Sequence, residues 1–600
     1  MPLLVWLGAL LGAFALWRVS ARRSVPNGLT RVAGPTRERW LTGNFQRLFK
    51  DGLEYNLGLI RQYGGVIKVH GPLGAQQLLV SDPRALHHIV VKDQDIYHET
   101  DMFLMTNRLI FGEGLIATVG EQHRKQRKML NPVFSLANMR SVLPTVVPIA
   151  EHLLERIREQ LPKGGGSAEV DMYPWAGRIT MDFLGGGVLG ISLDALDPEK
   201  TKEHANTIRK VSRTALRVLV LRPFIPMVVK NFSLYWRNKM VDWLPLPALR
   251  ELRELSRILD RCAWNVFHEK KDELENGMSD RDYEGPHRNL MTIMLEANQS
   301  SSEKERLTDD ELIGQINTLM IGGDTVTTAV ARVFWILARE QDAQARLRSE
   351  IRRAKMTVAA EHGLEDEGEK VPLPYDTLVS LPYLDAVVRE TLRLYPPTSL
   401  INRVATKDAI LPLQDPVHAT TGEETRAVHV PAGTNVIISI LGGNRNKRIW
   451  GDDADEWRPG RWLTGSGERI GWGKNVDLDL AFDDDASEGQ EKGHVVEGTP
   501  GYRNGVKYPG VYATMMTFLG GSRACIGFKF AEMELKQVLV TLISALHFSL
   551  PSAVDEEGVR KEVYWRMDGL QVPVVLPPHG DGKTAGVPLD IRPVKDSDFL

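Results

Sequence analysis

A cysteine in a glycine-rich segment is the first residue of this sequence that could carry redox or metal chemistry. Cys525 is preceded by Gly520 and Gly521 and followed by Gly527. Glycine has no Cβ, so the backbone here can closely approach a flat or bulky group. Helical spacing of apolar residues begins at Phe528, so Cys525 lies just before a helix N-terminus, where free N–H groups favour a thiolate. A thiolate is a soft metal ligand, although an inert, packed cysteine explains this segment equally well.

A polar pair at the middle of a long apolar segment could transfer protons. Thr308 and Glu311 have the spacing of a capping box, which predicts a helix that continues to about Glu340. At 1.5 Å per residue this helix is roughly 50 Å long, enough to cross a whole domain. Asp324 and Thr325 follow two glycines, which weaken the helix and admit a water molecule for proton relay. A kink with solvent-facing polar residues is the alternative interpretation.

Composition excludes several classes of protein. The 600 residues include only two cysteines, which excludes a disulfide scaffold, a cysteine-rich zinc module and a cysteine-ligated iron–sulfur cluster. The second, Cys262, lies in a helical stretch without glycines, which predicts a packing role. The net charge of −3 gives no basic excess, so we expect no nucleic-acid partner. A hydrophobic fraction of 42% is typical of a globular protein.

The segment around Cys525 resembles the haem-binding signature of the cytochrome P450 family, the haem-thiolate monooxygenases. The positions that define the signature are filled by Phe518, Gly521, Arg523, Cys525 and Gly527. The resemblance implies haem b as the cofactor, with Cys525 as the axial thiolate ligand of the iron. Further motifs follow in the order of the family, so the resemblance covers roughly residues 30–575.

Glu390 and Arg393 resemble the Glu-x-x-Arg motif of the same family. A helix expected over residues 382–395 places both side chains one turn apart on one face. Without further context they are an ordinary surface pair. In the family the pair is buried and completed by a second arginine, for which Arg461 is the candidate. Burial of these charges is tolerated only if all are paired, so the implied role is structural.

The polar pair in the long helix resembles the oxygen-activation motif of the family. The resemblance implies that Asp324 and Thr325 deliver protons to bound dioxygen. Ile321 and Val326 depart from the usual motif, although Asp324 and Thr325 remain in register.

Four further side chains resemble the ligands of the haem propionates. His123 and Arg127 match the family's Trp-x-x-x-Arg, with histidine in the tryptophan position. A basic helix surface is the alternative for these two residues. Arg403 and Arg523 match the remaining propionate ligands.

The N-terminus is the candidate membrane attachment. Residues 1–17 carry no charged side chain, and Arg18, Arg22 and Arg23 follow them. The positive-inside rule predicts a single-span anchor over residues 1–20 with the body in the cytosol. A cleaved signal peptide and a surface-lying helix are the alternatives. With the family resemblance, the expected location is the endoplasmic reticulum membrane, with the catalytic domain facing the cytosol.

The remaining pattern predicts a mainly α fold with a small β subdomain, the cytochrome P450 fold. Strand-like segments lie within residues 66–80 and 402–439, and helical spacing prevails over residues 82–350. The apolar stretch 216–229 is either core or a patch that dips into the membrane. The walls of the substrate pocket are expected within residues 97–111, 313–325 and 399–401, which are mostly apolar.

The absence of a domain linker within the body predicts one large catalytic domain. We expect a linker over residues 21–40, the catalytic domain over 41–580 and a C-terminal tail over 581–600. The polar segment 464–508 predicts an inserted surface loop. Its acidic run does not have the spacing of a calcium loop.

The implied activity is insertion of one oxygen atom from O2 into a lipophilic small molecule, by hydroxylation or epoxidation. The sequence has no Rossmann fingerprint or flavin domain, so electrons would come from a separate NADPH-cytochrome P450 reductase, with cytochrome b5 as an additional donor. We expect Lys529 and Lys536 to face the acidic reductase. The insertion and His123 are similar to fungal members of secondary metabolism, which suggests a terpenoid substrate.

Two other functions fit the same sequence. An isomerase or dehydratase of this fold would retain the haem and need no reductase. A membrane-anchored haem- or sterol-binding protein would bind its ligand and form no product with NADPH and reductase.

Overall fold

The computed structural model covers most of the chain. It describes residues 31–50, 52–200, 217–276, 289–364, 370–418, 422–470 and 498–599, with the isolated residues 12, 29, 207, 210, 211, 214, 215 and 368. The predicted anchor therefore lies outside the described residues, apart from residue 12, as does the centre of the predicted insertion. The described ends of the insertion include the short hairpin of β9 and β10.

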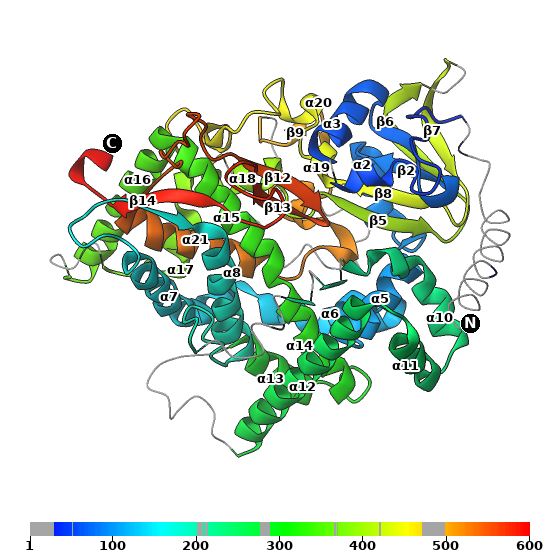
Figure 1. The fold of residues 1–600 in the computed structure, drawn as a ribbon, viewed down its shortest axis with the longest axis horizontal. Coiled ribbons are helices and arrows are strands. Elements are labelled where there is room, and N and C mark those ends of the chain that lie inside the picture. The colour runs from blue at the N-terminus through cyan, green and yellow to red at the C-terminus, as the bar shows by residue number, and fades with distance from the viewer. Residues whose placement is uncertain are drawn as a thin grey trace.

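Helices dominate the described part of the chain, which confirms the predicted mainly α fold (Figure 1). The α-helices are α2 Phe45–Lys50, α3 Gly52–Tyr63, α4 Pro83–His87, α5 Asp101–Phe111, α6 Gly120–Leu130, α7 Leu136–Arg158, α8 Met172–Phe183, α10 Ile225–Asn231, α11 Leu234–Trp243, α12 Pro247–Glu275, α13 Leu290–Ser300, α14 Asp309–Ile321, α15 Gly323–Arg339, α16 Gln341–Glu361, α17 Tyr375–Ser380, α18 Pro382–Leu394, α19 Ile440–Gly443, α20 Lys447–Trp450 and α21 Phe528–Ala545.

The strands form small sheets beside the helices. They are β1 Val66–His70, β2 Gln76–Val80, β3 Tyr97–His98, β4 Ala168–Asp171, β5 Leu400–Ala405, β6 Ala409–His418, β7 Glu424–Val430, β8 Asn435–Ser439, β9 Tyr502–Arg503, β10 Val506–Lys507, β11 Leu546–Ser549, β12 Val563–Asp568, β13 Leu570–Val575 and β14 Pro588–Pro593. The largest sheet has the order β1-β2-β8-β5-β3 and lies at the upper right of Figure 1.

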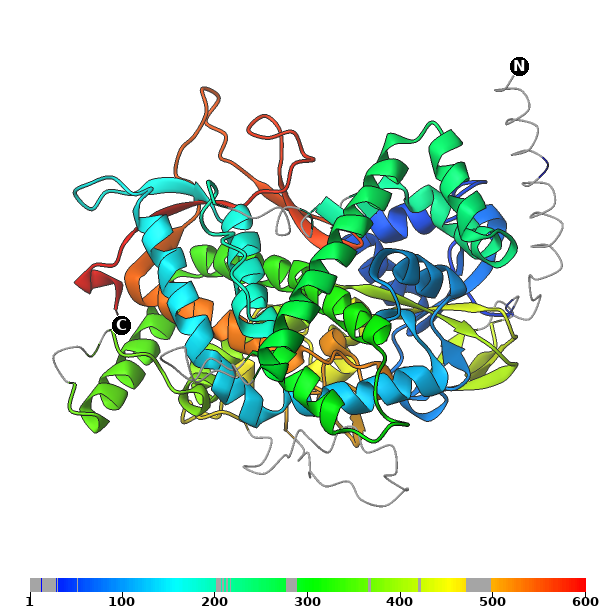
Figure 2. The same ribbon diagram turned by 90° about the horizontal axis from the view of Figure 1, so that it is seen from below.

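A long central helix is broken once, where the sequence has its two glycines. Thr308 and Glu311 form the predicted capping box at the start of α14. The helix breaks at Gly322, and α15 resumes at Gly323. A Cβ on Gly323 would lie 2.9 Å from the side chain of Leu184, so glycine permits close packing there. Figure 2 shows green helices from the middle of the chain at the centre of the molecule, between cyan and blue helices of its first third.

Only one helical rod of the described residues is long and apolar enough to cross a membrane by itself. It is the combined α14 and α15, and 67% of its apolar window is buried inside the protein. A bent pair, Gly120–Phe134 with Leu136–Arg158, meets the same criteria only when taken together. Extensive burial identifies the central rod as a core element.

The C-terminal residues belong to the catalytic body. Strand β14 pairs with both β11 and β4, so it is the central strand of a three-stranded sheet. Arg348 also donates to the carbonyl of Asp598 at 2.8 Å. The prediction of a separate tail over residues 581–600 was therefore wrong, because a short segment of low periodicity can still complete a sheet.

Candidate functional site

Cys525 lies in a tight loop that enters α21. Its backbone N–H donates to the carbonyl of Phe518 at 2.8 Å, which closes the loop. Gly521 has φ +69°, and a Cβ there would lie 1.8 Å from the carbonyl oxygen of Val90. Only glycine fits this position. Gly527 is the N-cap of α21, so Cys525 is placed just before a helix N-terminus, as the spacing predicts.

Two properties of Cys525 indicate an interior space beside it, which we call the hollow. Cys525 is accessible to solvent. The surrounding protein nevertheless buries the thiol, and this burial is the main cause that raises the thiol pKa. The Gly527 N–H and the charge of Arg127 act in the opposite direction and favour the thiolate. A side chain that is both accessible and closely surrounded borders an enclosed space. A bound cation would deprotonate the thiol there outright.

The break between α14 and α15 is also open. Gly322 is exposed although Gly323 and much of both helices are buried. Thr325 Oγ1 donates to the Gly322 carbonyl at 2.9 Å, and Thr328 Oγ1 donates to the Asp324 carbonyl at 3.3 Å. The hydroxyl of Thr325 thus lies at the break, where a helix admits water.

Two arginines join the cysteine loop to α6 and the turn before it. Arg127 of α6 donates to the carbonyl of Ala524 at 2.5 Å. Arg523 donates to the carbonyls of Thr118 at 2.6 Å and Leu115 at 3.4 Å. These bonds fix α6 and its preceding turn against the loop that carries Cys525.

Glu99 is a functional candidate that sequence reasoning missed. Its side chain is buried and forms ion pairs with Arg403 and Arg523, both at 3.2 Å. The buried guanidinium of Arg403 and the half-buried guanidinium of Arg523 therefore share one carboxylate. Burial lowers the pKa of Arg523 to about 10, and Glu99 opposes that shift. The only signal in the sequence was the position of Glu99 between strand-like residues and the N-cap Thr100. Acidic residues are common at such positions on protein surfaces, so this signal did not indicate a buried role.

His123 is neutral in this environment. Burial, with the charges of Arg523, Arg127 and Arg124, lowers its pKa to about 3. An uncharged imidazole offers one N–H donor. The alternative of a plain basic surface applies to Arg124, which is exposed, and not to the buried His123 and Arg127.

This set of residues fits haem b. Cys525 supplies a soft ligand that faces a hollow. Arg127, Arg403, Arg523 and His123 supply donors and an excess of positive charge, which suits two carboxylates. Gly527 leaves space beside the cysteine, because a Cβ there would meet only Phe134, at 3.9 Å.

Glu390 is the centre of a buried cluster. It accepts hydrogen bonds from Arg393 at 2.8 and 2.9 Å, from Arg461 at 3.3 Å and from the Trp462 indole at 3.0 Å. Glu390 and Arg393 have no exposed surface, which excludes the surface-pair interpretation.

The cluster also supports the start of the cysteine loop. Arg393 donates to the carbonyl of Asn444 at 2.8 Å. Asn444 in turn donates to Thr517 Oγ1 at 2.8 Å and accepts from the Met516 N–H at 2.7 Å. Thr517 directly precedes Phe518, so the buried charges set the position of the segment that leads to Cys525.

Neither of the two lysines expected to face a reductase is available. Lys536 is fully buried and donates to Asp385 at 2.8 Å and Glu532 at 2.6 Å. Lys529 is 6% exposed. That prediction was wrong, because both lysines lie on buried faces of α21. Cys262 is also buried, and burial raises its pKa to about 11, which fits its predicted packing role.

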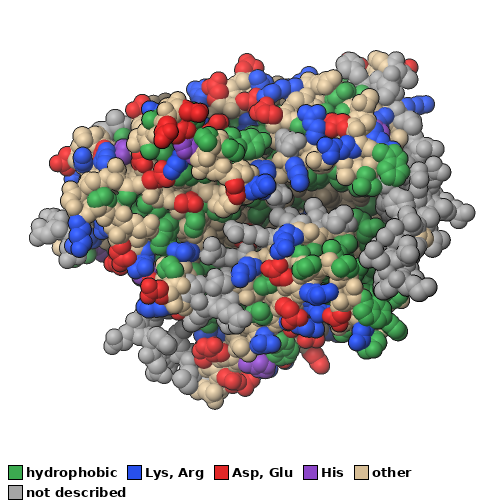
Figure 3. Space-filling view, in the orientation of Figure 1, with side chains coloured by type: hydrophobic (Ala, Val, Ile, Leu, Met, Phe, Trp, Pro, Cys, Tyr) green, Lys and Arg blue, Asp and Glu red, His purple; other side chains and the backbone are tan. Residues whose placement is uncertain are grey.

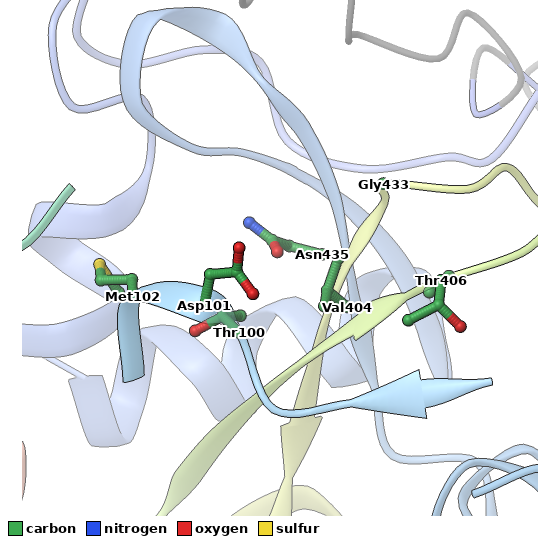
Figure 4. A pocket seen from close by; sticks show the side chains of 8 residues that line it. Thr100, Asp101, Met102, Val404, Thr406, Gly433 and Asn435 are labelled. Carbon is green, nitrogen blue, oxygen red and sulfur yellow. The ribbon is translucent and has the colours of Figure 1, made fainter. Parts of the chain in front are cut away.

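A surface cavity of about 530 Å³ lies beside the arginines. It is lined by Thr100, Asp101, Met102, Val404, Ala405, Thr406, Gly433 and Asn435. Thr100 follows Glu99, and Val404 follows Arg403. In Figure 4 the side chains of Asp101 and Asn435 point into the space between α5 and the sheet. Asp101 is also bonded to Lys230 of α10 at 2.6 Å, which joins α5 to α10 at this opening.

Comparison with known proteins agrees with this geometry. The family model for cytochrome P450 matches residues 33–572. Cytochrome P450 monooxygenase 91 of Postia placenta is 36% identical over 588 residues, 97% of this chain and 98% of the relative. Ganoderic acid synthetase CYP5150L8 of Ganoderma lucidum is 31% identical over 568 residues, 94% of each chain. The chain therefore belongs to the cytochrome P450 family and is an oxidoreductase of the monooxygenase type.

Proposed function

We propose that this chain holds haem b through Cys525 and inserts one oxygen atom from O2 into a lipophilic small molecule. The observation that carries the proposal is the position of Cys525, accessible from a hollow and adjacent to buried arginines. When bound, the haem supplies dioxygen activation, which is promoted by a thiolate ligand.

The protein residues have separate tasks in this proposal. Arg127, Arg403, Arg523 and His123 bind the two propionates and orient the cofactor. Thr325 Oγ1, at the break of the central helix, holds a water molecule, and with Asp324 it passes protons toward the hollow. The apolar walls exclude bulk water, so protons arrive only through this route.

The proposed substrate class is a secondary metabolite such as a terpenoid. Support comes from two sources: the apolar residues of the expected walls and the name of one relative, ganoderic acid synthetase. A lipophilic substrate gains most of its binding free energy from burial in such a pocket.

We propose that the protein lies at the endoplasmic reticulum membrane, through its N-terminus and through an exposed apolar surface. This surface is formed by Met227, Phe232, Leu234, Tyr235, Trp236, Trp243 and Leu246. Figure 3 shows hydrophobic side chains gathered at the lower right, over α5, α10 and α11. Tryptophan and tyrosine favour the membrane interface. Full-length Trp236→Glu protein should bind vesicles of phosphatidylcholine more weakly than Trp264→Phe protein; equal binding would contradict the role of this surface.

A separate NADPH-dependent reductase, with cytochrome b5 as a second donor, is the proposed source of electrons. Its docking surface is the exposed face of α6, because Arg124 and Lys128 lie there and Arg127 connects that helix to the cysteine loop. Basic side chains on this face suit an acidic partner.

Reconstitution tests the proposed activity. The purified chain is combined with a fungal NADPH-cytochrome P450 reductase, NADPH and a terpenoid extract, and products are read by mass. The proposal predicts a gain of one oxygen atom that requires both reductase and O2. Product without reductase would favour an isomerase or dehydratase. Ligand binding without any product would favour the non-enzymatic alternative.

A further inference from the structure

A buried arginine in the central helix has no acidic partner. Arg332 of α15 is 3% exposed, and no carboxylate among the described residues forms an ion pair with it. Burial lowers its pKa well below the ordinary value. Three aromatic rings surround the guanidinium carbon, at 3.4 Å from the ring centre of Trp565, 4.2 Å from Tyr395 and 5.6 Å from Trp335.

The guanidinium makes one hydrogen bond to a side chain of the β12–β13 hairpin. Arg332 Nη2 donates to Gln571 Oε1 at 2.8 Å, whereas Arg332 Nε has no partner among the described residues. Rings compensate a desolvated cation only in part. Burial of a cation without a carboxylate lowers stability, so a gain in stability does not explain an arginine at this position.

Gln571 extends this contact to a third segment. Its Nε2 donates to the carbonyl of Pro396 and to Ser399 Oγ, both at 3.1 Å. Its backbone N–H donates to the carbonyl of Pro397 at 3.0 Å. Gln571 is 2% exposed, and both the oxygen and the nitrogen of its side-chain amide form hydrogen bonds within the protein. The segment 396–399 leads directly into β5, which carries Arg403.

Arg332 and Thr325 lie on the same face of α15. They are seven residues apart, which is two turns or about 10.5 Å along the helix axis. Arg332 thus fixes the distance between the open break that holds Thr325 and the segment that starts β5. A shift of this segment would move residues 399–401, an expected wall of the pocket, relative to the proton-delivering side chain.

We propose that Arg332 and Gln571 are positioning residues that set substrate specificity. They hold residues 396–401 as a rigid wall against the helix that carries Thr325, and the wall contacts the lipophilic part of the substrate. This inference rests on the proposed function. Arginine is required because its planar guanidinium can stack on aromatic rings and donate to the Gln571 amide at the same time. The lysine ammonium cannot do both.

Two imidazoles of different size test the inference on the full-length, haem-loaded protein. Imidazole itself fits beside the iron without wall contacts, whereas 1-dodecylimidazole must also bind the walls. Affinities for both are measured by optical titration for the parent, Gln571→Leu, Gln571→Glu and Arg332→Lys proteins. Arg339→Lys is the matched control, because Arg339 stacks on the same Trp335 ring at 4.8 Å but is exposed.

The inference predicts a selective loss. In Gln571→Leu and Arg332→Lys proteins, affinity for 1-dodecylimidazole falls about tenfold, because a hydrogen bond to a charged group is lost, while affinity for imidazole changes less than about twofold. Gln571→Glu keeps the acceptor and restores affinity to within about threefold of the parent, and Arg339→Lys matches the parent.

Other outcomes overturn the inference or the proposed function separately. A parallel loss for both imidazoles, or no loss for either, would reduce the pair to a purely structural role. A parent protein without the carbon-monoxide difference spectrum of thiolate-bound haem would overturn the proposed function itself. If Gln571→Leu protein fails to fold, the test rests on Gln571→Glu and Arg332→Lys proteins. The ratio of their affinities for 1-dodecylimidazole and imidazole is then compared with that of the parent.

Discussion

Arg127 and Ala524 are 397 residues apart in sequence, and the guanidinium of Arg127 donates to the Ala524 carbonyl at 2.5 Å. Ala524 directly precedes Cys525, so α6 holds the backbone of the proposed ligand loop. Burial raises the pKa of the Cys525 thiol, and the charge of the same guanidinium opposes that rise. One side chain therefore links loop position, thiolate character and proposed propionate binding.

Replacement of Arg127 should release haem more readily. In Arg127→Gln protein, loss of a charge-assisted bond raises the rate of haem transfer to apomyoglobin by about tenfold or more. Arg124→Gln is the control, since Arg124 is exposed on the same helix. Equal transfer rates for the two variants would remove Arg127 from cofactor binding.

Replacement of Glu99 should cost more stability without haem than with it. Glu99→Gln leaves the buried Arg403 and the half-buried Arg523 without their shared carboxylate, which costs about 3 kcal/mol. Bound propionates would supply the missing negative charge. The thermal midpoint should therefore fall further in the apoprotein than in the haem-loaded protein.

Glu305→Gln is the control for this experiment. It removes an exposed ion pair to Lys128 and should change either midpoint little. Equal falls of the two midpoints in Glu99→Gln protein would show that the arginines do not meet the propionates.

His123 should make stability depend on pH in acid. Its folded pKa of about 3 lies below the ordinary value of 6.5, so the unfolded chain binds more protons between these values. Stability is fully present above pH about 6.5 and falls as the pH decreases toward 3, by roughly 5 kcal/mol at the limit. Thermal midpoints of the haem-free protein from pH 7 to about 4.5 should fall less steeply in the His123→Gln variant. An unchanged slope would contradict the burial of a neutral imidazole.

Thr325 should couple electron use to product. Thr325→Ala removes the hydroxyl at the helix break that is proposed to hold the proton-delivering water. Protons then no longer arrive by a defined route, and NADPH consumption yields hydrogen peroxide in place of product. The ratio of product to NADPH is the measurement, with Thr328→Ala as the control, because Thr328 lies one turn further along α15. Full coupling in Thr325→Ala protein would exclude the relay.

Local patterns predicted the elements that position the site. The capping box at Thr308 and Glu311 indicated the start of the central helix, and a pair of glycines marked its break. The helix α18 ends at Leu394, before two prolines, as proline chemistry requires. These features depend on residues close in sequence, which is why a single sequence reveals them.

Contacts between distant segments were not predictable in the same way. Glu99 meets Arg403 and Arg523 only after β3 pairs with β5, and nothing in its local pattern indicates burial. The two lysines of α21 were misplaced because that helix is surrounded on nearly all sides, so its apolar spacing did not define an exposed face. Two of the three rings around Arg332, those of Tyr395 and Trp565, likewise come from segments distant in sequence.

The spectrum of Cys525→Ser protein is the most direct measurement of the central claim. Serine keeps the size and the backbone of the loop but removes the thiolate. The account predicts that the parent shows the carbon-monoxide difference spectrum of thiolate-bound haem and that Cys525→Ser protein lacks it, while Cys262→Ser protein keeps it. An unchanged spectrum in Cys525→Ser protein would contradict the account.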